Sequence, residues 1–362
     1  MAEKVDYSKS LASASIAPHS HGIIAMSGEW VVEPDFRFIA PFSEGLAPAR
    51  GTGFEWGCID QTGKWLIPDK FEAIEGFQDS TSPAKFKGKW GLLNNLGRWK
   101  IKPRYEFVFS FREDLACAKF DGRYGYLDSR SKWAIKPYYH VDDIYQGFND
   151  GLARVQDKSL WGLMDKTENF IIPPQFEDIF WIFSDGKTPA KKDKWGFLDK
   201  EGFWIIPPRY EGLGSYQEGL AKAKVEGKWG FLNPEGNFAI DPDFDDVGSF
   251  HEGLATAQKG DKWGFIDQDG RWFMEPQFAS LSDFQDGLAR AGQNDKFGYI
   301  DKDARFLMEP VFDLLPESFS GGVAAVMKKG KWGIINYLGN WLVKPKFELI
   351  TLIPGEVESQ GN

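Results

Sequence analysis

One short stretch of the chain holds the residue types that acid–base catalysis requires. His140 lies beside Asp142 and Asp143 in the connection between Pro137 and Gly151. A histidine with neighbouring carboxylates can act as a general base, but no nucleophile elbow, oxyanion nest or phosphate-cradling glycine loop accompanies this one. The other three histidines lack the spacing of metal ligands: His19, His21 and His251. The sequence therefore predicts a protein that is not an enzyme.

A second candidate chemistry is calcium binding by Asp and Asn residues that recur about every 34 residues. Nine such positions occur: Asp60, Asn94, Asp128, Asp165, Asp199, Asn233, Asp267, Asp301 and Asn336. A calcium ion takes about six to eight oxygen ligands, whereas each turn offers a single side chain and three of the nine are Asn. We therefore predict that these side chains cap turns, and the sequence supports neither a metal site nor a cofactor.

These turns belong to a repeat that runs through nearly the whole chain. An aromatic residue or His is followed by Gly ten times, at intervals of 34 to 37 residues. The pairs begin at His21, Trp56, Trp90, Tyr124, Trp161, Trp195, Trp229, Trp263, Phe297 and Trp332. A fixed period of this length is the signature of a repeat architecture, in which each unit buries its apolar face against its neighbours. Repetition of this kind builds surfaces more readily than it builds catalytic sites.

Each repeat predicts a meander of three β-strands, and segments such as 244–247 allow a short fourth strand. The stretch 195–199 alternates bulky residues as a strand does, and 204–206 is the returning strand after a glycine turn. Small residues at 219–224 form the remaining strand. Because Gly is unfavourable inside a strand, its presence in every copy predicts that something packs too closely there for a Cβ. A neighbouring aromatic ring is the expected occupant.

Ten complete units predict one repeat domain at 10–351, with tails at 1–9 and 352–362. The expected fold class is all-β, either an open superhelix (a solenoid of stacked meanders) or a closed, β-propeller-like ring. We favour the open superhelix, because propellers usually have about four to eight blades and 34 residues are few for a four-stranded blade. The first unit, in which His21 replaces the usual Trp, would then cap the array.

The repeat unit has several linked positions. The string Gly-Lys-Trp-Gly-Phe-Leu-Asn-x-x-Gly at 227–236 is accompanied by Pro-x-Phe and Gly-Leu-Ala elements. In these features the chain resembles the WG (KWG) repeat family over nearly its whole length. The resemblance implies a β-strand-rich, chiefly bacterial protein and brings no catalytic residues with it. The departures from the pattern are His21, Tyr124 and Phe297 in place of Trp, and Ser131, Glu168 and Ala304 in place of the turn Gly.

Aromatic residues that break the repeat pattern form the candidate binding site. Of 15 tryptophans, 14 fall at two recurrent positions, which we interpret as core between repeats. The exception, Trp181, follows Phe180 where sister repeats carry smaller or polar residues. A connection lengthened by three residues adds Tyr138, Tyr139, His140 and Tyr145. Aromatics outside a core pattern are enriched at interface hot spots. The alternative is that they fill a gap made by the insertion.

Composition narrows the class of partner. With 43 Lys and Arg against 53 Asp and Glu, the net charge is −10, so nucleic acid is not an expected partner. No apolar run long enough to span a membrane and no secretory signal is visible, so we expect a cytoplasmic protein without membrane insertion. We predict a scaffold that binds a protein or peptide along an extended surface, rather than a small-molecule substrate. The alternative is a carbohydrate- or cell-envelope-binding module with Trp rings facing solvent at repeat intervals.

Overall fold

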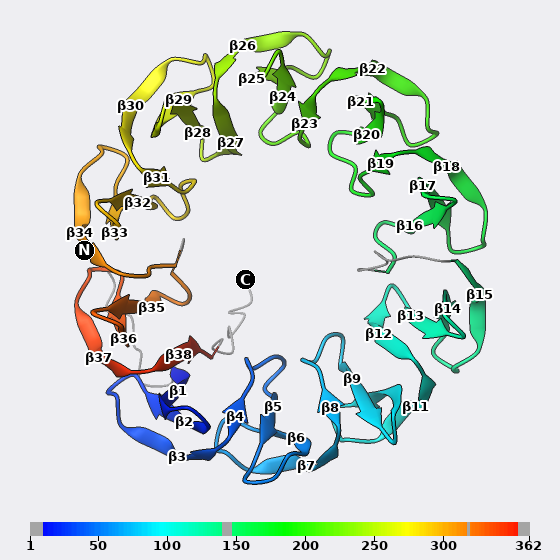
Figure 1. Cartoon of the computed structure of the whole chain (residues 1–362), viewed down its shortest axis with the longest axis vertical. Helices are drawn as coiled ribbons and strands as arrows, with labels where there is room; N and C mark the ends of the chain where they lie inside the picture. Colours follow the sequence, from blue (N-terminus) through cyan, green and yellow to red (C-terminus); the bar gives the residue numbers. More distant parts are fainter. Residues whose placement is uncertain (1–9, 140–146, 317–318, 354–362) are drawn as a thin grey trace, which may run out of the picture. The chain divides into compact units, whose positions relative to one another are not determined.

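The computed structural model describes residues 10–139, 147–316 and 319–353. These residues form 38 β-strands and no helix, which confirms the all-β prediction (Figure 1). The strands make ten antiparallel sheets, of which eight have four strands and two have three. Each sheet contains one of the ten aromatic–glycine pairs, so one repeat supplies the greater part of one sheet.

Four kinds of strand recur along the chain. The first strands are β4 (Phe38–Ile39), β8 (Ala73–Ile74), β12 (Phe107–Arg112), β19 (Asp178–Ile179), β23 (Gly212–Leu213), β27 (Asp246–His251), β31 (Ser280–Leu281) and β38 (Leu349–Leu352). The second strands carry the small residues: β1 (Leu11–Ala17), β5 (Ala47–Arg50), β9 (Thr81–Phe86), β13 (Leu115–Phe120), β16 (Leu152–Asp157), β20 (Thr188–Lys192), β24 (Ala221–Val225), β28 (Leu254–Lys259), β32 (Ala289–Gln293) and β35 (Val323–Lys328).

The third strands contain the recurrent glycine: β2 (Ser20–Ala25), β6 (Trp56–Ile59), β10 (Lys89–Asn94), β14 (Arg123–Leu127), β17 (Leu160–Asp165), β21 (Lys194–Leu198), β25 (Lys228–Leu232), β29 (Lys262–Asp267), β33 (Lys296–Ile300) and β36 (Lys331–Asn336). The fourth strands are β3 (Trp30–Phe36), β7 (Trp65–Phe71), β11 (Trp99–Tyr105), β15 (Trp133–Tyr139), β18 (Phe170–Phe176), β22 (Trp204–Tyr210), β26 (Phe238–Phe244), β30 (Trp272–Phe278), β34 (Phe306–Phe312) and β37 (Trp341–Phe347). The short additional strand that the sequence allowed is therefore present.

The chain divides into two compact units. The first unit comprises Met1–Ser110, Asp295–Tyr299 and Phe306–Asn362, and it contains the complete sheets β3-β2-β1-β38, β4–β7, β8–β11 and β35–β37. The second unit comprises Phe111–Asn294 and Ile300–Arg305, and it contains the complete sheets β16–β18, β19–β22, β23–β26 and β27–β30.

Within the first unit, the two ends of the repeat array share one sheet. The C-terminal strand β38 pairs antiparallel with β1, and Ala14 lies opposite Ile350 (Figure 1). The backbone N–H of Glu348 donates to the carbonyl oxygen of Ser15 at 2.7 Å. The expected open superhelix, with its first unit as a cap, is therefore wrong. One sheet per repeat, with the first sheet completed by the last strand, is the topology of a ten-bladed β-propeller.

A physical reason for this pairing is that β38 gives β1, the first strand of the array, a partner along an edge that would otherwise be exposed. Side-chain packing continues across the junction. The ring of Trp30 in β3 lies 5.6 Å from that of Phe347 in β37 and meets it edge-on. Trp99 in β11 meets Phe71 of the preceding repeat in the same way, at 5.7 Å. Because the edge-on contact recurs between consecutive repeats, the interpretation as core between repeats is confirmed for the aromatics that begin the fourth strands.

The backbone of the fourth strand passes directly over the glycine of each third strand. A Cβ on Gly57 would lie 2.4 Å from the carbonyl oxygen of Ile67 and 2.6 Å from the ring of Trp65. In all ten repeats the nearest atom is such a carbonyl oxygen, at 2.3 to 2.6 Å. The pairing register of β7 shifts opposite this glycine, so a bulge brings its backbone over β6. The predicted close approach is confirmed, but the nearest occupant is backbone rather than an aromatic ring.

The recurrent Asp and Asn residues cap the turns between third and fourth strands. The carboxylate of Asp60 accepts hydrogen bonds from the backbone N–H of Thr62 at 2.9 Å and of Lys64 at 3.1 Å. Asn94 accepts the equivalent bonds from Leu96 and Arg98. The turn-capping prediction is therefore confirmed. In the part of the chain that the structure describes, no group of three or more His, Cys, Asp or Glu residues could hold a metal ion.

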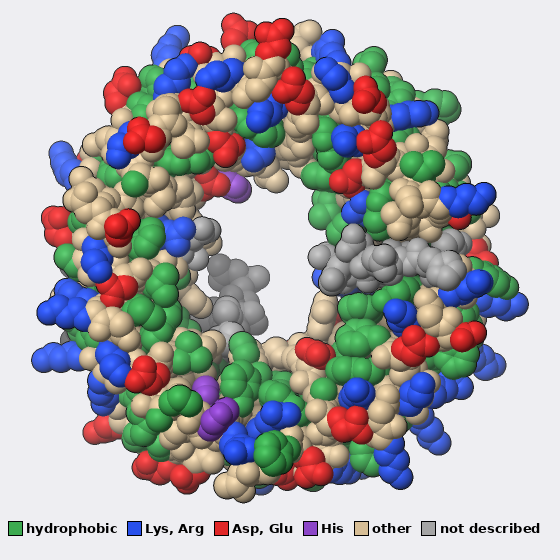
Figure 2. Space-filling view, in the orientation of Figure 1, with side chains coloured by type: hydrophobic (Ala, Val, Ile, Leu, Met, Phe, Trp, Pro, Cys, Tyr) green, Lys and Arg blue, Asp and Glu red, His purple; other side chains and the backbone are tan. Residues whose placement is uncertain are grey.

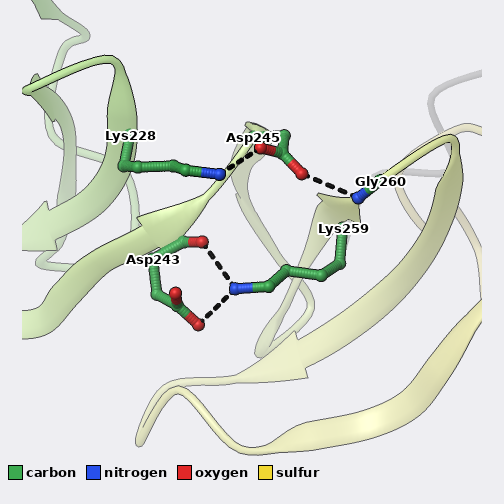
Figure 3. Close-up of polar contacts among 5 residues, drawn as sticks. All are labelled: Lys228, Asp243, Asp245, Lys259 and Gly260. Carbon is green, nitrogen blue, oxygen red and sulfur yellow. Dashed lines mark hydrogen bonds and ion pairs between the residues drawn. The ribbon is translucent and has the colours of Figure 1, made fainter.

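Carboxylates also join consecutive sheets of the second unit (Figure 3). Asp245, between β26 and β27, forms an ion pair with Lys228 and accepts the backbone N–H of Gly260 at 2.7 Å. Lys259 beside it forms an ion pair with Asp243 at 2.6 Å. The charges of Lys228 and Lys259 are therefore neutralised by carboxylates of the same unit.

Candidate functional site

The predicted aromatic site lies only partly within the described residues. His140 and Tyr145 fall outside them, and so does the side chain of Tyr139 at the end of β15. Tyr138 is 57% exposed on β15, and Trp181 is half-buried in the connection between β19 and β20.

No ring contact joins these two residues in the described chain. Phe180 instead packs against Trp195, with 5.5 Å between the ring centroids. The indole Nε1 of Trp181 is buried and has no hydrogen-bond acceptor among the described residues. The binding role of this cluster stays a prediction.

A pocket of about 620 Å³ lies in the first unit, between the sheets β3-β2-β1-β38 and β4–β7. We call it the seam pocket, because its walls include the sheet in which the first and last strands meet. It is lined by Pro18, His19, His21, Arg37, Phe38, Arg50, Phe54, Trp56 and Leu349. Figure 2 shows histidine and basic side chains beside hydrophobic ones over β2, β4 and β5.

Two departures from the repeat build this pocket. The imidazole of His21 stands where most repeats have a larger indole, and its ring centroid lies 5.2 Å from that of Phe38 in the pocket wall. The connection between β5 and β6 has five residues, 51–55, whereas Lys87 and Gly88 alone connect β9 to β10. Phe54 in the longer connection is 75% exposed. Both features depart from the regular repeat pattern at this pocket.

Two arginines supply the charge of the seam pocket. The guanidinium of Arg37 lies over the ring of Phe54, and that of Arg50 over the ring of Trp56, each at 4.7 Å from the centroid. Neither arginine forms an ion pair with any residue that the structure describes. The Nε of Arg50 is buried without a hydrogen-bond partner there. No Asp or Glu lines the pocket, so two positive charges remain without a neighbouring carboxylate in its walls.

His21 adds little charge at neutral pH. It is buried, and this burial, followed by the charge of His19, lowers the pKa of its imidazole below the ordinary value of 6.5. Arg37 and Arg50 give the pocket a fixed positive charge, because a guanidinium is always protonated. Apolar rings beside fixed positive charges suit the binding of an anionic group that carries apolar neighbours.

The sequence carries two signals of this pocket, although the repeat pattern alone does not single it out as a site. They are His21 in place of the usual Trp and the five-residue connection at 51–55. Neither signal indicates a pocket until β38 is known to pair with β1, because Leu349 reaches the pocket only through that pairing.

The repeat geometry has a counterpart among known families. The family model described as the WG containing repeat matches ten times, at residues 22–50, 56–90, 90–124, 124–160, 161–194, 195–229, 229–263, 263–297, 297–332 and 332–353. The chain belongs to the WG repeat family. This confirms the resemblance inferred from the linked sequence positions, and the WG glycines are the ones over which the fourth strands fold.

Solved structures similar to this WG repeat chain are distant in sequence. A crystal structure of the eukaryotic initiation factor is 10% identical, with a TM-score of 0.51, and the match covers 96% of this chain and 99% of that one. BamB from Moraxella catarrhalis is 11% identical, with a TM-score of 0.36 and coverage of 74% and 91%. The dihydro-heme d1 dehydrogenase NirN is 11% identical, with a TM-score of 0.39 and coverage of 94% and 77%. The first likeness shows a shared fold and nothing about function.

No curated protein matches the WG repeat chain. Among the residues that the structure describes, no helix is long and apolar enough to cross a membrane.

Proposed function

We propose that this WG repeat protein is a non-enzymatic, cytoplasmic binding module that holds a peptide, or a segment of a protein, in the seam pocket. The observation that carries the proposal is the combination of apolar rings and unpaired guanidinium groups in one pocket of about 620 Å³. Ligand pockets usually have volumes of about 300–1,000 Å³. Trp and Arg, both present in the walls, are enriched among the residues that dominate binding at protein interfaces.

The exposed ring of Phe54 supports the same proposal. The guanidinium of Arg37 lies over this ring at the pocket, and Phe54 is 75% exposed. Covering an exposed aromatic ring with a partner removes apolar surface from water, which favours association.

The carbohydrate alternative depends on Trp rings that face solvent at repeat intervals. The rings at the start of the fourth strands pack edge-on against the preceding repeat, as Trp272 does against Phe244 at 5.5 Å. This packing favours a structural role for these rings, and we do not extend the proposal to carbohydrates.

Selection from a random peptide library displayed on phage tests the proposed function with a defined probe. Wild-type protein should enrich a peptide family, and Phe54→Ser should reduce binding of the enriched peptides by at least about tenfold, since Trp and aromatic anchors dominate such interfaces. Phe203→Ser is the matched control, because Phe203 is 71% exposed in a turn of the second unit. This control should bind like wild type.

Three outcomes of the selection are informative. Failure of wild type to enrich any peptide would contradict the proposed function, and binding on a glycan array would then favour the carbohydrate alternative. Loss of binding in Trp181→Ser with retention in Phe54→Ser would move the site to the predicted aromatic cluster. Equal loss in Phe54→Ser and Phe203→Ser would indicate a nonspecific effect of removing exposed rings.

A further inference from the structure

We propose that the seam pocket selects acidic peptides, in which the carboxylate of an Asp or Glu side chain is bound by Arg37 and Arg50 while an adjacent apolar side chain packs on the rings of the pocket. This inference rests on the proposed peptide-binding function and names its ligand class. It is argued from the charges, rings and donors of the lining.

The two guanidinium groups are placed so that their N–H edges can bind a planar anion. Each group lies over an aromatic ring at 4.7 Å, so its face is used by the ring while its N–H edges remain for hydrogen bonds. The buried Nε of Arg50 has no partner among the described residues. A buried donor without an acceptor is unfavourable, so a shift of the Arg50 side chain that brings this N–H to a carboxylate in the pocket would be favourable.

The pocket differs in charge from the rest of the molecule. The chain has a net charge of −10, and several basic residues elsewhere pair with carboxylates, as Lys228 does with Asp245 and Lys166 with Glu113. Arg37 and Arg50 have no such partner in the described chain. Screening in physiological salt limits distant charges to a range of about 8 Å. The local charge of the two arginines therefore determines what the pocket attracts.

The apolar walls of the pocket would bind the apolar side chain that lies next to the acidic residue of the peptide. Phe38, Trp56 and Leu349 lie beside the charged groups in the same pocket. A free carboxylate alone would leave these surfaces in contact with water, whereas a peptide can place an aromatic or aliphatic side chain next to its acidic residue.

The donors of the lining favour a carboxylate over a phosphoryl group. A phosphorylated side chain carries a charge of about −1.5 to −2 and three acceptor oxygens. The lining offers two arginines and two histidines, with no Lys, Ser or Thr. His21 is kept neutral by burial at neutral pH. A single carboxylate matches this donor set more closely.

The phage selection gives the first test of the charge preference. Peptides enriched by wild type should carry Asp or Glu next to Phe, Trp, Leu or Ile. Enriched peptides without acidic residues would overturn this inference and leave the peptide-binding function standing, whereas no enrichment at all would overturn both.

A double-mutant cycle on the most enriched peptide gives the second test. We expect replacement of its acidic residue by the amide to weaken binding to wild type by at least about tenfold in fluorescence polarisation, because hydrogen bonds between charged groups are lost. In Arg50→Gln the acidic and amide peptides should bind with nearly equal affinity. Arg209→Gln is the matched control, since Arg209 lies over the ring of Tyr210 at 5.2 Å, outside the pocket, and it should retain the tenfold preference.

Two results would each overturn a different part of this inference. A tenfold preference that persists in Arg50→Gln and Arg37→Gln would overturn the assignment to these arginines. Tighter binding of a phosphoserine version of the peptide would overturn the choice of a carboxylate. Circular dichroism of each variant separates loss of binding from loss of folding.

Discussion

At the scale of single residues, the glycine of each WG pair has a role that its neighbours in sequence do not reveal. The bulged fourth strand passes over it, and a carbonyl oxygen occupies the place of a Cβ. The sequence predicted that something approaches closely, because Gly persists where a strand would favour a larger residue. It could not identify the occupant, since the bulge depends on how residues fifteen positions apart are paired.

Gly57→Ala should be strongly destabilising. Its Cβ would lie 2.4 Å from the carbonyl oxygen of Ile67, so backbone must move, at a cost of about 2–3 kcal/mol in the free energy of unfolding. Urea unfolding followed by tryptophan fluorescence measures this. Gly53→Ala, where no atom lies within 4 Å of the new Cβ, should change stability by less than about 0.5 kcal/mol. Equal effects of the two substitutions would contradict the role given to Gly57.

The candidate site shows the limit of sequence reasoning at the same scale. Trp181 was selected because it is an aromatic outside the recurrent positions, and it is half-buried with an unpaired indole N–H among the described residues. Arg37 and Arg50 looked like ordinary surface residues in the sequence. Their importance comes from the rings beneath them and from the missing carboxylates, which are properties of the folded pocket.

At the scale of strands and turns, most of the fold could be predicted from the sequence. Alternating bulky residues, capped turns and the small-residue strand define the meander in every repeat, and the structure has these strands where they were expected. The turn side chains bond the backbone that follows them, as Asp60 does with Thr62 and Lys64. These features are local, so the residues that determine them are near one another in sequence.

The loop 51–55 gives a prediction at this scale. Replacing these five residues by Asp-Gly, the pair that connects β13 to β14 at Asp121 and Gly122, should shorten the connection without disturbing the strands. The free energy of unfolding should change by less than about 1 kcal/mol, while binding of the enriched peptide should fall at least about tenfold, because Phe54 is removed. Binding is measured by fluorescence polarisation.

A control graft separates the loop's role from the general effect of a turn replacement. Asp-Gly placed at 294–295, between β32 and β33, should leave peptide binding unchanged. Unchanged binding in the 51–55 graft would show that this loop does not form part of the site.

At the scale of the whole chain, the number of repeats could be predicted from the sequence, but the prediction of an open superhelix was wrong. Ten blades exceed the usual number, and 34 residues seemed too few for four strands. The argument failed because most of the first strands are very short: β4 and β8, for example, have two residues each. The pairing of β1 with β38 joins residues more than 330 positions apart, and no local pattern indicates such a contact.

The seam pocket depends on this pairing, since its walls include His21 near one end of the chain and Leu349 near the other. A cross-link between β1 and β38 is therefore the most direct test of the account. Ser13 and Thr351 lie opposite each other in this pair, and opposed strand positions fall within the Cα separation that a disulfide allows, about 4.4–6.8 Å. The native thiols Cys58 and Cys117 are buried and can be retained.

The measurement is the oxidation state of the double variant Ser13→Cys, Thr351→Cys, followed by proteolysis and mass spectrometry under non-reducing conditions, with each single variant as control. We expect a monomer in which a disulfide joins the two peptides that contain positions 13 and 351, and no such species in the single variants. Free thiols or disulfide-linked dimers under the same conditions would contradict the pairing of the first and last strands and, with it, the pocket between them.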